Sequence, residues 1–108
     1  MGEWGEETIL DWVILNFEHG KQTFHYAKNM FDALHVVMKN DLPDYWVDEL
    51  KTICAVICYW IASNILETNK LTHCLINKVL GTNYCSCDLE DLKMFIVKKL
   101  EYDILIYL

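Results

Sequence analysis

The chain has 108 residues, of which 54% are hydrophobic, and its 16 acidic and 9 basic side chains give a net charge of −7. This length fits one domain with a real hydrophobic core, and the composition excludes a disordered or low-complexity chain. All of the basic residues are lysines. Arginine is the side chain that most often binds phosphates and guanine edges, so an acidic chain without it is not expected to bind nucleic acid.

The sequence also bears on membranes and on the redox environment. The longest apolar run, Ile53 to Ala62, is shorter than the roughly 18 residues of a membrane span. The acidic start of the chain lacks the basic, then apolar pattern of a signal peptide. An odd number of cysteines, five, is typical of reduced thiols in a reducing compartment. We therefore expect an intracellular protein of the cytoplasm or nucleus that binds no membrane.

Apolar residues recur every three or four positions along most of the chain, which predicts helices and no strands. The first expected helix runs from Glu6 to Phe17 and ends before His19-Gly20. The second runs from Thr23 to Met38, and Thr23 could cap it. A break follows at Asn40-Asp41-Leu42-Pro43-Asp44.

The third expected helix runs from Tyr45 to Leu66, and its segment Ile53–Ala62 has no polar face. A helix that is apolar all round is buried on all sides. We therefore expect this helix to lie at the centre of the fold, with the other helices packed around it.

The fourth expected helix runs from Lys70 to Leu80, with Thr68-Asn69 as its cap and Gly81 as its end. After a loop from Thr82 to Cys87, the fifth runs from Asp88 to Glu101. The apolar tail, residues 102–108, must pack on the body or on a partner. The sequence thus predicts an all-α class, with five helices in a single domain over residues 1–108.

Metal binding would need the soft ligands His73, Cys74, Cys85 and Cys87. Their spacing matches no common zinc module. Cys54 and Cys58 lie one turn apart in the apolar helix, where cysteine behaves as a small hydrophobic residue. We predict no metal and no cofactor.

Catalysis would need a nucleophile, a base and an orienting group in one cleft. The chain contains no nucleophile elbow, no zinc-protease motif and no glycine-rich phosphate loop. We predict no catalytic residues and a protein that is not an enzyme.

Tryptophans and acidic residues are the remaining candidates for partner contact. Trp60 is expected in the core, Trp46 is expected to hold the start of the third helix, and Trp4 is the best candidate for exposure. The acidic groups near the start of the chain and around Asp44 are interpreted as solvated faces or as a landing site for a basic partner.

Four blocks of the sequence resemble the cyclin family. Leu10-Asp11-Trp12-Val13 resembles the "L-V-D-W-L" of the first cyclin helix, and residues 24–32 resemble the second helix. Tyr59-Trp60-Ile61-Ala62-Ser63-Asn64 is similar to "L-L-I-A-S-K" at the end of the central helix, and residues 91–104 are similar to the fifth helix. The blocks occur in the cyclin order and span about residues 9–104. The chain therefore resembles a single N-terminal-type cyclin box, such as that of a viral or otherwise divergent cyclin-like protein.

The resemblance implies a five-helix cyclin box without catalytic residues. Cyclins dock on a cyclin-dependent kinase through the third and fifth helices and reposition its regulatory helix, which shifts the population toward the active kinase. The resemblance thus implies that this chain binds a cyclin-dependent kinase or a similar protein kinase and regulates its activity in cell-cycle or transcription control.

The chain departs from the cyclin pattern at the positions that contact the kinase. Asn64 stands where cyclins have a lysine, and Lys93 stands where they have a glutamate. Asp11 lacks its usual arginine partner because the matching residue is Glu6, and only Ile9 and Trp12 keep the apolar character of the substrate-docking motif. The candidate partner-binding residues are Asn64, Glu67, Lys93, Ile9, Asp11 and Trp12.

Three alternatives remain beside kinase regulation. A cyclin-like adaptor that binds other proteins is favoured by Asn64 and Lys93. Nucleic-acid binding, as in transcription factors with a cyclin fold, is disfavoured by the acidic charge. A helical bundle like those of death regulators would also contain a buried central helix, but it would not predict the four ordered blocks.

Overall fold

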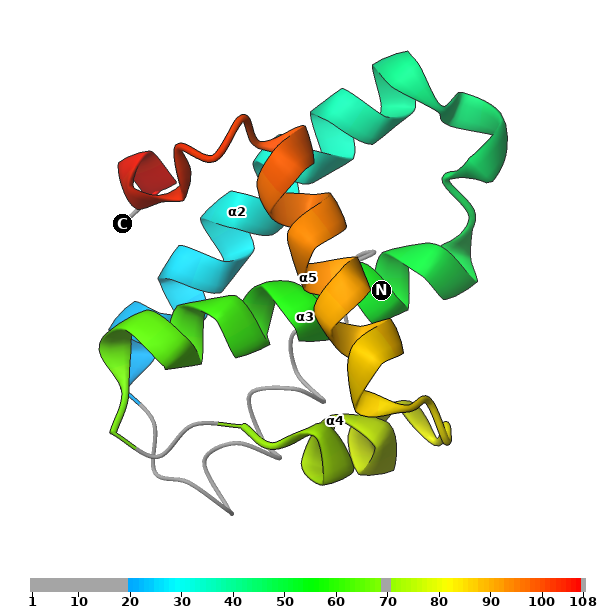
Figure 1. Ribbon diagram of the computed structural model, residues 1–108. Helices are drawn as coiled ribbons and strands as arrows, with labels where there is room; N and C mark the ends of the chain where they lie inside the picture. The colour runs from blue at the N-terminus through cyan, green and yellow to red at the C-terminus, as the bar shows by residue number, and fades with distance from the viewer. Residues whose placement is uncertain (1–19, 69–70, 108) are drawn as a thin grey trace.

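The computed structural model describes residues 20–68 and 71–107, and every regular element in these two ranges is helical. The predicted all-α class is therefore confirmed. The first expected helix, with Ile9, Asp11 and Trp12, lies outside the described residues. Figure 1 shows, in chain order, α2 (Lys21–Asp41), the 3₁₀ turn η1 (Pro43–Tyr45), α3 (Asp48–Leu66), α4 (His73–Leu80), α5 (Ser86–Lys99) and the 3₁₀ turn η2 (Ile104–Tyr107).

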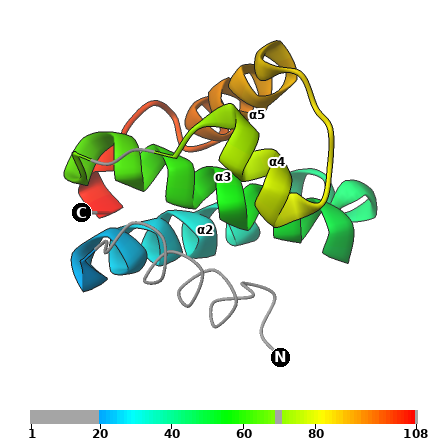
Figure 2. The same cartoon turned by 90° about the horizontal axis from the view of Figure 1, so that it is seen from below.

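Helix α3 supplies the largest share of the core. Every residue from Cys54 to Ser63 is buried, and each large apolar side chain buried in this way stabilises the fold by about 1.5–3 kcal/mol. In Figure 2, α2 lies on one side of α3, while α4 and α5 lie on the other. Within the described residues α3 is also the one helix whose length and composition would let it cross a membrane, a test that the core helix of a soluble protein passes equally well.

Helix α2 faces α3 with one apolar stripe. It begins at Lys21, two residues earlier than predicted, and Gly20 is its N-cap residue. Thr23 is therefore not the cap; it lies inside the first turn and is buried. The stripe follows the three- and four-residue spacing of a helix face and consists of Phe24, Ala27, Met30, Phe31, Leu34 and Met38.

The connection between α2 and α3 contains a tight turn at the place where the sequence predicted the start of the third helix. Helix α3 begins at Asp48 and not at Tyr45, because Trp46 and Val47 have non-helical backbone angles. The indole of Trp46 is buried and its Nε1–H donates to Nδ1 of His35 at 2.7 Å. Trp46 therefore fastens the turn before α3 to the side of α2, as expected.

The boundaries of α4 and α5 also differ from the predicted ones. Helix α4 begins at His73, and its cap is Thr72, whose Oγ1 accepts the Leu75 N–H at 3.3 Å. The predicted cap at Thr68-Asn69 is wrong because Thr72 meets the backbone N–H groups at the actual helix start. Gly81, with φ 66°, ends α4 as predicted. Helix α5 begins at Ser86, two residues before the predicted start.

Part of the apolar tail packs on the body of the protein: Ile104 and Tyr107 contact the core, whereas Tyr102, Leu105 and Ile106 are exposed. Helix α5 ends at Lys99, and the chain then turns sharply through two residues in the left-handed region, Glu101 and Tyr102. The hydroxyl of Tyr26 in α2 donates to the backbone oxygen of Ile104 at 3.1 Å. The Asn29 amide donates to the backbone oxygen of Tyr107 at 3.2 Å. These bonds attach η2 to α2.

Candidate functional site

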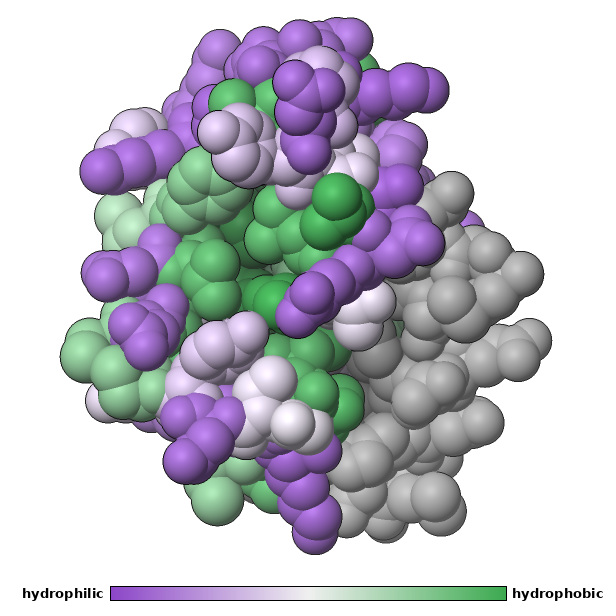
Figure 3. Space-filling view, turned by 90° about the vertical axis from the view of Figure 1, so that its right-hand side faces the viewer, coloured by the Kyte–Doolittle hydropathy of each residue, from purple (hydrophilic) through white to green (hydrophobic). Residues whose placement is uncertain are grey.

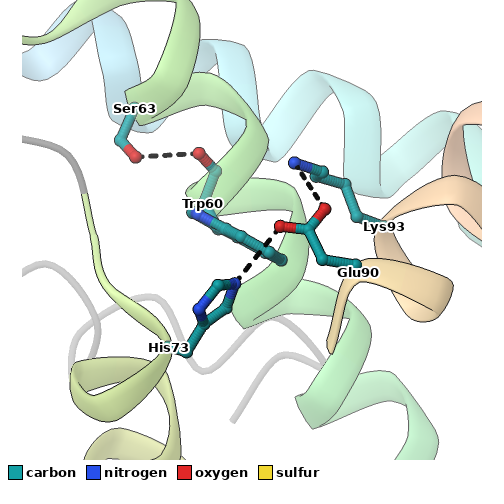
Figure 4. Close-up of polar contacts among 5 residues, drawn as sticks. All are labelled: Trp60, Ser63, His73, Glu90 and Lys93. Carbon is teal, nitrogen blue, oxygen red and sulfur yellow. Dashed lines mark hydrogen bonds and ion pairs between the residues drawn. The ribbon is translucent and has the colours of Figure 1, made fainter. Parts of the chain in front are cut away.

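Side chains from three helices meet where α3, α4 and α5 approach one another. Trp60 comes from α3, His73 from the first residue of α4, and Glu90 and Lys93 from neighbouring turns of α5. Figure 4 shows these side chains pointing toward one another. We refer to Trp60, His73, Glu90 and Lys93 as the α3–α5 cluster.

Trp60 is the apolar floor of the cluster. Its side chain is buried, and the His73 ring approaches it edge-on, with the two ring centroids 5.2 Å apart. The Lys93 ammonium lies 4.4 Å from the centroid of the Trp60 ring, where the negative face of the indole attracts a cation. One turn later in α3, the buried Ser63 hydroxyl donates to the Trp60 backbone oxygen at 2.8 Å. The indole is thus held between a cation, an imidazole and its own helix.

Glu90 joins the two polar side chains that contact Trp60. Its Oε2 lies 3.0 Å from the Lys93 ammonium and its Oε1 lies 3.2 Å from Nε2 of His73. The hydrogen bond with Lys93, followed by that with His73, lowers the pKa of the Glu90 carboxyl. The carboxyl group is therefore ionised at neutral pH, and its charge offsets that of Lys93.

The cluster holds α4 and α5 against α3 and still faces solvent. The side chains of His73 and Glu90 are 40% and 46% exposed, and that of Lys93 is 25% exposed. Each polar member contacts another member, so the arrangement is compensated in charge before any partner arrives. Such a group can position helices and offer paired charges to another protein.

Of the predicted partner-binding residues, Lys93 lies in this cluster and Asn64 lies beside it. Asn64 is half-buried and follows Trp60 by four positions in α3. Side chains four positions apart share one face of a helix, so Asn64 lies on the side of α3 that carries Trp60. The chain thus brings two of the three described candidates to the same region.

Glu67, the third described candidate, has a structural contact instead. Its Oε2 accepts the Gly20 N–H at 2.9 Å and also accepts the Thr23 hydroxyl. Gly20 is the N-cap residue of α2 and Thr23 lies in its first turn, where the positive end of the helix dipole favours a nearby carboxylate. Glu67 therefore caps α2 from the end of α3, a role that sequence reasoning missed because the partners are far apart along the chain.

The cysteines and His73 do not gather into a metal site within residues 20–68 and 71–107. In these ranges no group of three or more histidine, cysteine or acidic side chains could hold an ion. His73 is bonded to Glu90, while the sulfur atoms of Cys85 and Cys87 lie 3.0 Å apart at the start of α5.

Sequence reasoning also missed the part that Glu90 plays. A Glu–Lys pair three positions apart on one helix is a local signal that could have indicated the contact with Lys93. The approach of His73 and Trp60 could not be found this way, because it depends on how three helices pack. No family model, curated protein or solved structure matches this chain.

Proposed function

We propose that this chain is a non-enzymatic, cyclin-like protein that binds a cyclin-dependent or related kinase and changes its activity. The proposal takes the observed helices as part of a five-helix cyclin box, with α3 as its central helix. Its main support is the α3–α5 cluster, because α3 and α5 are the two helices that the cyclin resemblance assigns to kinase docking.

The pairing of Lys93 with Glu90 reduces the charge repulsion that a lysine at this position would cause in a kinase complex. An unopposed lysine in place of the cyclin glutamate would face a cation of the kinase, and such a like-charge contact costs several kcal/mol. Lys93, however, is paired with the ionised Glu90, one turn earlier in α5. In the proposed complex Glu90 supplies the carboxylate that the cyclin pattern expects, displaced by one turn.

Exposed apolar side chains of α3 and α5 support a protein partner. Ile65 follows Asn64 in α3 and is 41% exposed, and Met94 follows Lys93 in α5 and is 44% exposed. Interfaces combine such exposed apolar groups with a polar rim. Figure 3 shows that, on the side of the molecule that carries the α2–α3 connection, hydrophobic side chains also gather between hydrophilic ones.

The order within the cluster fits the physical task of a regulator. A surface whose side chains are already fixed loses little conformational entropy when it docks. By binding the active form of a kinase more tightly than the inactive form, such a surface would raise the population of the active form. The expected consequence is a change in kinase activity without chemistry on this chain.

The second candidate is a cyclin-like adaptor that binds proteins other than kinases. The observation that favours it is the engagement of Lys93, which is already bound to Glu90 and to the Trp60 ring. Asn64 also lacks the charge of the cyclin lysine. An adaptor would keep the helical frame and use a different part of the surface.

Affinity capture with matched variants distinguishes the two candidates. Tagged wild-type chain is used to capture proteins from a cell lysate, and captured kinases are identified by mass spectrometry and by phosphorylation of a generic substrate. Kinase regulation predicts that the wild type captures a cyclin-dependent or related kinase and that the variants Lys93→Ala and Glu90→Gln capture at least about tenfold less, a loss of about 1.4 kcal/mol. Lys98→Ala, which removes an exposed lysine from the same helix, is the control and should capture as much as the wild type.

A variant that carries the charges of the cyclin pattern tests the adaptor proposal. The double variant Asn64→Lys with Lys93→Glu restores both charges of the cyclin pattern. If the wild type captures no kinase and the double variant does, the kinase proposal fails and the adaptor is favoured. Circular dichroism of each variant checks that the helices are retained.

A further inference from the structure

Cys85 and Cys87 stand at the exposed start of α5, with their sulfur atoms 3.0 Å apart. Cys85 is the N-cap residue of α5 and Cys87 is the second residue of the helix. Neither the proposed kinase contact nor the α3–α5 cluster uses them.

The backbone on either side of these thiols is held in place. The Asn77 side chain in α4 accepts the Tyr84 N–H at 2.9 Å and donates to the Tyr84 backbone oxygen at 2.8 Å. Asn77 also accepts the Thr82 hydroxyl at 2.8 Å. The loop is therefore fixed immediately before Cys85, and the helix fixes the chain after it.

The helix start sets a separation that a disulfide can bridge. Residues two positions apart at a helix start have Cα atoms roughly 5.5 Å apart, and disulfides join Cα atoms about 4.4–6.8 Å apart. The sulfur atoms need to approach by about 1 Å to reach the covalent bond length of about 2.0 Å. Side-chain rotation can supply most of this movement because both residues are exposed.

We propose that Cys85 and Cys87 form a thiol–disulfide exchange site that closes reversibly into an intramolecular disulfide. The co-reactant is a low-molecular-weight disulfide of the glutathione type. One cysteine thiolate attacks the small disulfide, which forms a mixed disulfide and releases one small thiol. The second cysteine thiolate then attacks the protein-side sulfur and releases the second small thiol. Two protein thiols become one disulfide, one small disulfide becomes two small thiols, and the protons of the protein thiols end on them.

The position of the second thiol decides the product. In the mixed disulfide the remaining cysteine is already beside the reacting sulfur. Its effective concentration there is much larger than the concentration of free glutathione, so ring closure is favoured over exchange with glutathione. We expect the internal disulfide to exceed the mixed disulfide by at least about tenfold at millimolar glutathione.

The hydrogen bond between the two thiols affects the rate. It is the main cause that raises the pKa of the Cys85 thiol, which reduces its thiolate fraction at neutral pH. Because the thiolate is the attacking form, exchange should accelerate steadily as the pH rises above neutrality.

The chain contains a second cysteine pair that serves as an internal contrast. Cys54 and Cys58 lie one turn apart in α3, and both are buried. Burial raises the pKa of Cys54 to about 12 and that of Cys58 well above its ordinary value. These thiols should stay reduced and unalkylated as long as the chain is folded.

The test equilibrates the reduced, full-length chain without oxygen in glutathione buffers with a rising share of the oxidised form. Alkylation, intact mass measurement and peptide mapping then locate each disulfide. We expect the wild type to lose two alkylatable thiols together, through a bridge between Cys85 and Cys87 that a small dithiol reverses. The control Cys74→Ser, which removes the other described exposed cysteine, should give the same result.

Single variants complete the test. Cys85→Ser and Cys87→Ser should each accumulate a mixed disulfide with glutathione at the cysteine that remains. The proposal is overturned if the wild type accumulates mixed disulfide as these variants do, if the bridge includes Cys74, or if neither thiol is oxidised in an excess of oxidised glutathione. Protection of Cys54 and Cys58 from alkylation verifies that each sample is folded.

Discussion

Residues 54–63 of α3 are all buried, whereas the polar side chains that α4 and α5 add around Trp60 remain partly exposed. Both regions contain ionisable groups, but water reaches only one of them. In α3, burial raises the pKa of Tyr59, with a further contribution from the charge of Glu67. At the surface, contact with Lys93 lowers the pKa of Glu90.

Exposure decides what a residue type can do in this chain. A thiol inside α3 fills space, while a thiol at the start of α5 can react. A charge at the rim of the α3–α5 cluster is partly exposed and can therefore contact a partner directly, which a fully buried group cannot do. Stability should therefore depend most on the interior, and interaction should depend most on the rim.

The largest effect is expected in the interior of α3. Ile57→Ala removes a fully buried side chain and leaves a cavity, so the free energy of unfolding should fall by about 2–5 kcal/mol. Urea denaturation followed by circular dichroism measures the change. Ile65→Ala, in the exposed part of the same helix, is the matched control and should cost less than about 1 kcal/mol. Equal losses would contradict the burial of this segment.

The cap that Glu67 supplies to α2 is expected to give the next largest effect. Glu67→Ala removes the acceptor for the Gly20 N–H and the Thr23 hydroxyl and should cost about 1–2 kcal/mol of unfolding free energy. Glu67→Gln keeps an acceptor but loses the charge, so it should cost less. A glutamine variant as unstable as the alanine variant would argue against the hydrogen bonds, and kinase capture unaffected by either variant would assign Glu67 to structure alone.

The contact between Trp46 and His35 should have a smaller effect. Trp46→Phe keeps an aromatic ring but removes the Nε1–H that donates to His35, which should cost about 1 kcal/mol. His35→Phe removes the acceptor. If the bond is what matters, the double variant should cost less than the sum of the two single variants in urea denaturation. Strict additivity would show that the two residues act independently.

The smallest effect concerns Glu90 at the rim. Because contact with Lys93 and His73 holds its pKa below the ordinary value in the folded protein, ionised Glu90 adds stability above that ordinary value. This stability is lost as the pH falls through the folded-state pKa. Lys93→Ala should raise the pKa of Glu90 toward its ordinary value in a carboxyl NMR titration, while Lys98→Ala should not change it. If the pKa of Glu90 is unchanged in the Lys93→Ala variant, the ion pair between Glu90 and Lys93 does not contribute in solution.

The periodicity of apolar residues was enough to predict most helices. The stripe from Phe24 to Met38 and the unbroken apolar run after Ile53 both predicted helix, and Gly81 predicted the end of α4. Helix starts were less predictable. Thr23 and Thr72 are both reasonable caps by residue type, but only Thr72 lies where a helix begins, because α2 begins earlier, after Gly20. The carboxylate that accepts hydrogen bonds at the start of α2 comes from Glu67, at the end of α3.

The candidate site was predictable only in its parts. The cyclin resemblance singled out Asn64 and Lys93 one by one, and the structure brings both to the face of α3 that carries Trp60. The cyclin resemblance gave no indication that Lys93 is paired with Glu90. The role of Glu67 was also hidden, since its partners follow from the packing of α3 against α2.

Composition and short-range spacing were enough to predict that this chain is helical and acidic and that the segment Ile53–Ala62 is largely buried. The pairing of charges, the cap that Glu67 supplies to α2 and the contact between two of the exposed thiols became visible in the folded chain alone. Such contacts join residues through space, and their free energies depend on distance and exposure that no local pattern encodes.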